Sequence, residues 1–485
     1  MSKANLSAGG SPAAAEAGYG TLVTSRLGPT TAFAAPETQP LLADGSDLHA
    51  PPSGSAVAHT GSDASAVFHV VCVMAGTGIL QLPYCIKQGG WLSLIWIVVA
   101  AVVSNYTGIL LIRSLYTQLG VRHSSFSDVA GAAFGHRGRV LTRIFKDVSS
   151  IGTCTLFLIL AGFNLNTLVT PEAGLVGVRY WIVGCAALVT VPYVVMRTIQ
   201  DAVIMSVFGA ATTGMMVVII LGLGVLDLPN RPSHDYVLVD VAGFPVALSA
   251  ICFSFGGNVV WPQVEHGLCD RRTWPRVLTT ATTIVSVMYL MVATLGYLVY
   301  DAESASPIFL NLPPGAALTV ANLMVTVHVL LTTPIMMSSV STEFEAEYHG
   351  QYFATGEITP PASPGSTGDL GLGLGSVTKS SAQLWWDDLL FRALIRIPLM
   401  TLTMLCAIFV PFFADVMSLL GSLIYAMLIF VFPVVIYGRL TGWAAFRHTW
   451  TRWANWLIIV IGVVCCVVGT YEAILALIRD FQTSL

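Results

Sequence analysis

Charged residues are scarce in this chain, and their scarcity excludes an ordinary soluble domain. Asp, Glu, Lys and Arg make up 10% of the 485 residues, whereas a typical soluble domain carries about 25%. Hydrophobic residues make up 55% of the chain, and the mean hydropathy is +0.76. We therefore expect an all-α integral membrane protein that crosses the bilayer several times.

Motifs of several other protein classes are also missing. The nine cysteines form no C-x-x-C pair, so they are best interpreted as small apolar side chains in buried positions. No basic tract indicates nucleic acid as a partner. No HExxH motif, phosphate-binding loop or nucleophile–base pair indicates an enzyme. We expect no catalytic residue, no metal and no cofactor.

Apolar runs of about 20 residues, the length that spans the hydrocarbon core, recur from residue 66 onward. Residues 1–64 are rich in Ala, Ser, Gly, Pro and Thr and predict a disordered tail. The transmembrane domain is expected at 65–480, with a flexible loop at 342–390 inside it. The eleven expected helices are 66–86, 91–116, 146–169, 180–197, 202–226, 242–264, 276–300, 317–341, 391–413, 415–438 and 455–478.

The distribution of basic residues predicts the orientation of these helices. If the N-terminus is cytosolic, only Lys87, Arg179, Arg231 and Arg479 of the 22 Lys and Arg residues lie on the other side. Such an excess of positive charge on one side marks the cytosolic face of a membrane protein. The sequence therefore predicts a cytosolic N-terminus and a lumenal C-terminus.

Two of the expected helices contain residues that interrupt a helix. The first has Gly76–Gly78 and then Pro83, and the sixth has Gly256–Asn258 and then Pro262. Paired breaks of this kind point to a transporter of two inverted five-helix repeats, with an eleventh helix appended. Close helix packing is the alternative explanation for glycine in membrane helices.

Backbone groups at a break must face a wet cavity or protein, because lipid cannot satisfy them. The free amides of a half-helix carry about +0.5 charge and suit a carboxylate, whereas free carbonyls suit an ammonium group. The two breaks together are therefore expected to bind a zwitterion such as an amino acid. The predicted substrate-binding residues are Gly76, Thr77, Gly78, Ile79, Phe255, Gly256, Gly257 and Asn258.

Several motifs resemble the amino acid/auxin permease family. They include "GTGILQLPYCIKQGGW", "SNYTGILLIRSLY" and "SFGGNVVWPQVEHGLCDRRTWPRVL", and the resemblance covers residues 64–478. Within the family, the chain is most similar to the branch of vesicular inhibitory and fungal vacuolar amino acid transporters. The resemblance implies the eleven-helix inverted-repeat fold and proton-coupled amino acid transport. Asp301 departs from a glycine that many relatives have, which leaves the substrate open.

Four polar residues are candidates for coupling. His328 lies in the middle of an expected helix and could carry a proton, or it could be a neutral histidine bonded to a neighbouring helix. Thr332 and Thr333 could bind a cation or the substrate, or could bond their own backbone. Glu265 could act in gating or coupling, or could be a solvated helix end. Tyr425 could line the cavity or pack against other helices.

The tail contains one informative string, with Glu37 four places before Leu41 and Leu42. It resembles the acidic dileucine signal that sorting adaptors read on cargo for lysosomes or vacuoles. A sorting adaptor is therefore a candidate partner beside the amino acid, the proton and the lipid bilayer. A vacuolar, lysosomal or vesicular membrane is favoured over the plasma membrane.

These observations predict a secondary active transporter of small neutral amino acids that is coupled to protons, for example as an antiporter, and works by alternating access. Two alternatives remain. One is a non-transporting amino-acid sensor or scaffold of the same fold, and the other is a sodium-coupled permease of the plasma membrane. The specific amino acid, the direction of transport and the coupling ion stay open.

Overall fold

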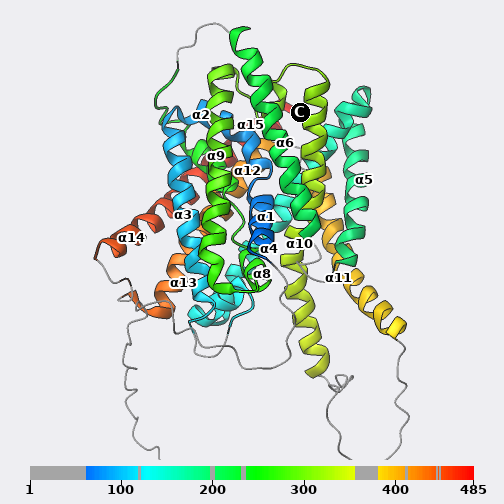
Figure 1. Ribbon diagram of the computed structural model, residues 1–485, viewed down its shortest axis with the longest axis vertical. Helices are drawn as coiled ribbons and strands as arrows, with labels where there is room; N and C mark the ends of the chain where they lie inside the picture. The colour runs from blue at the N-terminus through cyan, green and yellow to red at the C-terminus, as the bar shows by residue number, and fades with distance from the viewer. Residues whose placement is uncertain are drawn as a thin grey trace, which may run out of the picture. The chain divides into compact units, whose positions relative to one another are not determined.

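The computed structural model describes the membrane body and leaves out most of the tail. The dileucine residues Glu37, Leu41 and Leu42 lie outside the described residues, as does the middle of the predicted 342–390 loop. The described part is built of helices (Figure 1). It comprises residues 62–117, 122–196, 203–230, 236–354, 381–409, 413–443, 446 and 449–484.

Each of the expected apolar runs contains helix. A 3₁₀ helix, Thr77–Gln81, links the first two helices, and π-helical turns interrupt the last two runs. The α-helices are α1 (Asp63–Met74), α2 (Leu82–Gly89), α3 (Leu92–Ser114), α4 (Phe126–Val169), α5 (Gly174–Val195), α6 (Val203–Asp227), α7 (Phe244–Ser254), α8 (Trp261–His266), α9 (Trp274–Tyr300), α10 (Ala316–Ala354), α11 (Ser381–Phe409), α12 (Phe413–Leu419), α13 (Phe432–Thr441), α14 (Thr449–Val464) and α15 (Thr470–Ser484).

The number of spans depends on how the interrupted helices are counted. In the described residues, nine helices are long and apolar enough to cross a membrane, and the bent pair of α1 with Thr77–Gly89 makes ten. The expected sixth span is divided into α7, with 11 residues, and α8, with 6 residues. Each piece alone is shorter than the hydrocarbon core. Eleven spans therefore remain a prediction that requires α7 and α8 to form one interrupted span.

The third helix begins earlier than its apolar run. α4 starts at Phe126 rather than at residue 146, because the Ser125 hydroxyl caps it by accepting a hydrogen bond from the Asp128 amide at 3.1 Å. Gly135, at φ 69°, divides α4 into a short first segment and a second one, which carries Arg137, Arg139 and Arg143 before its apolar run begins. The segment was missed because an apolar window does not detect a charged helix.

Part of the predicted loop at 342–390 is helical, which corrects that prediction at both ends. α10 continues to Ala354, and α11 begins at Ser381. Ion pairs hold the continuation of α10 against its neighbours: Glu343 lies 2.8 Å from the Lys146 ammonium of α4, and Glu345 lies 2.7 Å from the Arg396 guanidinium of α11. These pairs join residues far apart in sequence, so composition alone could not predict them.

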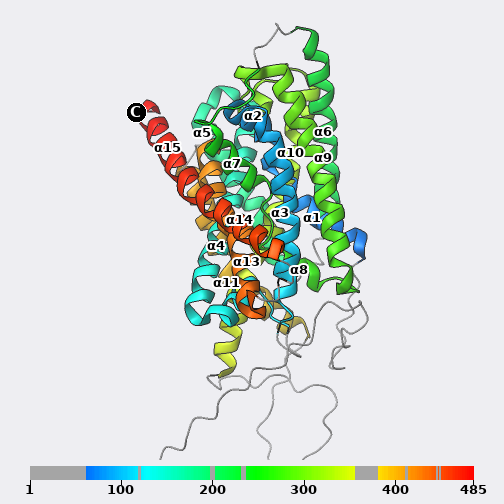
Figure 2. The ribbon, with the colours of Figure 1, turned by 90° about the vertical axis from the view of Figure 1, so that its left-hand side faces the viewer.

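Three spans form the centre of the membrane body. In α4, in α10 and in the span from α12 to α13, 72% of the most apolar window is buried, compared with 33% in α5, 22% in α11 and 28% in α14–α15. The latter helices present apolar side chains outward, as helices in contact with lipid do. Figure 2 shows α14 and α15 running obliquely along the outside of the bundle. The site is therefore expected between the central helices and the broken ones.

Candidate functional site

The first break lies between α1 and the 3₁₀ helix Thr77–Gln81. α1 ends at Met74, and the chain bends by 41° before it resumes. The first amides of the 3₁₀ helix, including that of Gly78, have no partner within the helix. A Cβ on Gly78 would lie 2.6 Å from the Cα of Ser254, so the glycine allows the two broken helices to touch.

The second break covers residues 255–260, between α7 and α8. The Phe255 ring packs against Tyr289, with 5.2 Å between ring centroids. A Cβ on Gly257 would lie 2.6 Å from the Trp261 ring. The Asn258 amide donates a hydrogen bond to the Leu428 carbonyl at 3.3 Å. Side chains thus fill much of this longer break.

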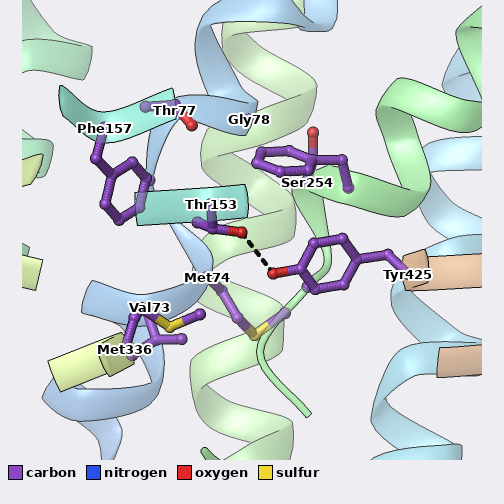
Figure 3. A pocket seen from close by; sticks show the side chains of 12 residues that line it. Val73, Met74, Thr77, Gly78, Thr153, Phe157, Ser254, Met336 and Tyr425 are labelled. Atoms are coloured by element: carbon purple, nitrogen blue, oxygen red, sulfur yellow. Dashed lines mark hydrogen bonds between the residues drawn. The ribbon is translucent and has the colours of Figure 1, made fainter. Parts of the chain in front are cut away.

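A cavity lies between the two breaks (Figure 3). The space inside it is about 280 Å³ when the open solvent at its mouth is included. Its open centre has room for little more than one water molecule. The break residues are joined there by residues of α4, α10 and the π-helical turn after α12. The lining residues are Val73, Met74, Gly76, Thr77, Gly78, Thr153, Phe157, Phe253, Ser254, Gly256, Met336 and Tyr425.

The structure places half of the predicted binding residues at this cavity. Gly76, Thr77, Gly78 and Gly256 line it, and substrate binding by them stays a prediction. The other four are buried or packed elsewhere and do not line it: Ile79, Phe255, Gly257 and Asn258. They were included because they adjoin the glycines in sequence, but an interrupted helix still turns neighbouring side chains in different directions.

Sequence reasoning missed most of the remaining wall. The Thr153 and Tyr425 hydroxyls form a hydrogen bond of 2.7 Å across the cavity (Figure 3). Tyr425 was considered for the cavity, and the structure places it there. Thr153 and the apolar residues carried no signal, because ordinary membrane helices contain the same residue types.

Tyr289 of α9 joins the two breaks. Its hydroxyl lies 2.6 Å from the Met74 carbonyl and 2.6 Å from the Ser254 carbonyl. The Thr213 hydroxyl similarly lies 3.3 Å from the Ala75 carbonyl. The carbonyl ends of α1 and α7, which were expected to receive an ammonium group, therefore already face hydroxyl groups of the protein, and the single Tyr289 proton is shared between Met74 and Ser254. The amide side of the first break is the better fit for a ligand.

His328 of α10 lies beside the first break. Its Nδ1 is 2.8 Å from the Thr213 hydroxyl and 3.0 Å from the Gly209 carbonyl, both on α6. A Cβ on Gly76 would lie 3.6 Å from its Nε2. The histidine is thus bonded to a neighbouring helix, and its position next to the break also suits a proton carrier. A second histidine, His69 of α1, is buried and bonded to α6 as well.

The two threonines after His328 bond their own helix. Thr332 donates to the His328 carbonyl at 2.8 Å, and Thr333 donates to the Val329 carbonyl at 2.7 Å. Both hydroxyls are fully buried. This geometry favours the structural alternative for these hydroxyls over a cation site. In the part of the chain that the structure describes, no group of three His, Cys, Asp or Glu residues could hold a metal ion.

Glu265, at the end of α8, is fully buried and paired, so its interpretation as a solvated helix end is wrong. Its carboxylate lies 2.7 Å from the Arg122 guanidinium and accepts a hydrogen bond from the Tyr116 hydroxyl. Burial raises the pKa of Tyr116, and the adjacent Glu265 raises it further, so the phenol keeps its proton and donates. Arg122 also donates to the Pro262 carbonyl at 2.7 Å. The cluster ties α8 to the connection after α3 and does not line the cavity.

Comparison with known proteins agrees with this arrangement. Residues 59–475 match the family model described as transmembrane amino acid transporter protein. The amino acid transporter AVT1J of Arabidopsis thaliana is 26% identical over 416 residues, 84% of this chain and 89% of that protein. The vesicular inhibitory amino acid transporter of Mus musculus is 27% identical over 436 residues, 86% of this chain and 76% of that protein.

A solved structure gives the same fold at low identity. A Na⁺-coupled sialic acid symporter in its substrate-bound outward-open state superposes with a TM-score of 0.52 at 14% identity, covering 86% of this chain and 90% of that chain. This likeness concerns the fold alone. The curated relatives are named as transporters and not as enzymes, and the motifs at both breaks lie inside the matched range. The chain belongs to the transmembrane amino acid transporter family, the amino acid/auxin permease family.

Proposed function

We propose that the chain is a secondary active transporter that moves small neutral amino acids across an endomembrane by proton-coupled alternating access. The observation that carries this proposal is the cavity between the two breaks. The free amides of the 3₁₀ helix at Thr77 and Gly78 border it. A substrate carboxylate placed there would meet the positive end of a helix.

The composition of the cavity supports a small and neutral substrate. None of the described residues that line it is charged, so an ionised substrate side chain would lose its hydration without gaining a counter-charge. The narrow open centre of the cavity favours a small ligand. Because the open centre is narrow, the walls must separate before an amino acid fits.

Alternating access is supported by the pairing of the breaks. α1 and α7 would begin the two inverted repeats, and a rocking motion of one repeat against the other would open the cavity to each side in turn. The cluster of Glu265, Arg122 and Tyr116 closes α8 against the connection after α3. In the predicted topology this is the cytosolic side, so opening toward the cytosol would part these residues.

Proton coupling rests on His328. It lies within contact distance of the break and bonds α6 through Thr213. Histidine is the side chain whose unperturbed charge changes near neutral pH. Protonation would turn both ring nitrogens into donors, which changes the contact between α10 and α6 beside the substrate.

An endomembrane address is supported by the mouse relative, whose name is vesicular, and by the resemblance of Glu37, Leu41 and Leu42 to a sorting signal. Figures 1 and 2 place α2 and the end of α15 at the end of the bundle opposite α8. That arrangement is compatible with a lumenal C-terminus. Replacement of both leucines by alanine is expected to move the protein toward the plasma membrane.

Uptake of labelled amino acids by vesicles reconstituted with the purified protein tests the proposal. We expect uptake of small neutral amino acids that follows an imposed pH gradient, persists in choline buffer and collapses with a protonophore. His328→Gln is expected to abolish the response to the gradient while exchange of substrate for substrate continues. A strict sodium requirement would favour the sodium-coupled alternative, and binding without uptake would favour the sensor.

A further inference from the structure

The Thr153 hydroxyl of α4 is directed across the cavity. It forms a hydrogen bond of 2.7 Å with the Tyr425 hydroxyl (Figure 3), and both residues are buried and line the cavity. A threonine in a membrane helix more often bonds its own backbone, as Thr155 does by donating to the Ile151 carbonyl at 2.8 Å. The bond between Thr153 and Tyr425, here called the hydroxyl pair, therefore holds two polar groups at the cavity wall.

Tyr425 is held in position by α7 and the second break. Its ring packs edge to face against Phe253, with 5.4 Å between the ring centroids. A Cβ on Gly256 would collide with the same ring, so the glycine lets the tyrosine come close. Tyr425 also ends the π-helical turn Leu420–Tyr425, and turns of this kind occur frequently at functional sites. The hydroxyl pair is thus placed at the cavity by a well-packed ring.

An amino acid in this cavity needs acceptors for its ammonium group, because a buried charge is costly unless it is hydrogen-bonded. No charged side chain among the described lining residues supplies a counter-charge. The carbonyl ends of α1 and α7 already face the Tyr289 and Thr213 hydroxyls. A hydroxyl can donate and accept at the same time, so the hydroxyl pair keeps acceptor capacity after one member has donated to the other.

Thr77 supplies a third hydroxyl at the cavity. It lines the cavity on the 3₁₀ helix that follows the first break. Its Oγ1 is buried and has no hydrogen-bond partner among the described residues, whereas buried polar groups nearly always have one. With the hydroxyl pair, the cavity wall therefore offers three hydroxyl oxygens, one for each N–H of an ammonium group.

We propose that the hydroxyls of Thr77, Thr153 and Tyr425 bind the ammonium group of the transported amino acid. This inference rests on the proposed transport function and narrows its substrate class to amino acids with a primary ammonium group. N-methylation keeps the charge but removes one N–H donor, which leaves one of the hydroxyls without its partner. A site that bonds a substrate N–H discriminates against the analogue that lacks it for this reason.

Binding of alanine and N-methylalanine to the purified full-length protein tests the proposal. We expect the wild type to bind alanine about tenfold or more tightly than N-methylalanine, as the loss of a hydrogen bond to a charged group predicts. Thr153→Val and Tyr425→Phe preserve the shape of the side chain and each remove one hydroxyl. Each variant should bind alanine about tenfold more weakly and bring the two affinities close together. Thr155→Val, whose hydroxyl bonds Ile151 of its own helix, is the matched control and keeps the preference.

The ratio of the two affinities separates substrate binding from a structural role of the hydroxyl pair. Because both variants keep the shape of the wall, a preference that is only steric would stay unchanged in them, and this result would overturn the proposal. Equal affinities in the wild type, or no binding of alanine, would also overturn it. Uptake of labelled alanine by reconstituted vesicles is measured separately. Binding with the expected ratios but without uptake would contradict the proposed transport function alone, and uptake with an unchanged ratio would contradict the hydroxyl assignment alone.

Discussion

The two broken helices carry similar sequence motifs, but the backbone groups exposed at the two breaks differ in what they contact. The first break is short, at Ala75 and Gly76, and resumes as a 3₁₀ helix whose first amides stay free. The second covers residues 255–260 and is filled by aromatic rings and an asparagine bonded to Leu428. The first break therefore offers backbone to a ligand, and the second mainly forms a wall. A glycine-rich break in a membrane helix is thus not by itself a binding site.

Gly78→Val tests the first break, and we expect it to have the largest effect. A Cβ at this position meets the Ser254 backbone at 2.6 Å, so the two broken helices must move apart. Uptake per purified molecule should fall about 100-fold or more, since displacements near 1 Å have effects of that size in preorganised sites. The same overpacking should also lower the unfolding midpoint, so uptake is compared per folded molecule. Wild-type uptake by this variant would remove the site from the proposal.

Gly257→Val tests the second break, and the sequence alone predicts the same result as for Gly78. The structure changes that expectation, because a Cβ on Gly257 meets the Trp261 ring at 2.6 Å and the residue does not line the cavity. We expect a loss of about 1–3 kcal/mol of stability from overpacking. Thermal unfolding should show a lower midpoint, while uptake per folded molecule falls far less than for Gly78→Val. Adding Trp261→Phe, which makes room for the new side chain, should partly restore the unfolding midpoint of Gly257→Val. Loss of transport by Gly257→Val at wild-type stability would contradict this prediction.

Tyr289→Phe tests the connection between the breaks. It removes the donor shared by the Met74 and Ser254 carbonyls, and leaving a buried carbonyl unpaired costs about 1–3 kcal/mol. We expect uptake to fall about tenfold, with a moderately lower unfolding midpoint. Tyr297→Phe, two turns along the same helix, is the matched control because its hydroxyl accepts a hydrogen bond from the Val237 amide at 3.3 Å, outside both breaks. Equal effects of the two variants would show that the connection is only structural.

Ser104→Ala should have the smallest effect. The Ser104 hydroxyl reaches the Phe255 carbonyl of the second break at 3.4 Å, which is long for a hydrogen bond. Uptake should stay within about twofold of the wild type, as expected for the loss of a weak bond. Thr213→Val, the corresponding change at the first break, should lower uptake more because Thr213 contacts both Ala75 and His328. A larger loss of uptake for Ser104→Ala than for Thr213→Val would show that the second break contributes more to transport than the first.

Much of the fold could be predicted because membrane helices are encoded locally. Length, hydropathy and the glycines at Gly76 and Gly257 indicate where helices lie and where two of them break. The polar extensions of α4 and α10 could not be predicted in this way. They are held by a cap at Ser125 and by ion pairs such as Glu343 with Lys146, and the ion pairs join residues far apart in the chain.

The candidate site could be predicted only in part. The glycines of the breaks carry a backbone signal, and four of the eight predicted residues line the cavity. Tyr289 was missed because its role depends on two carbonyls that precede it in sequence by 215 and 35 residues.

The absence of charge among the described residues that line the cavity has an electrical consequence. A zwitterionic amino acid crosses such a cavity with no net charge, and the wall around it brings no counter-charge of its own. In the proposed proton-coupled cycle, the proton is then the one species that moves net charge across the membrane. Transport driven in this way responds to voltage as well as to pH, by about 2.3 kcal/mol for each proton at 100 mV. Clamping the potential of the vesicles with potassium and valinomycin would change the rate even at equal pH on both sides.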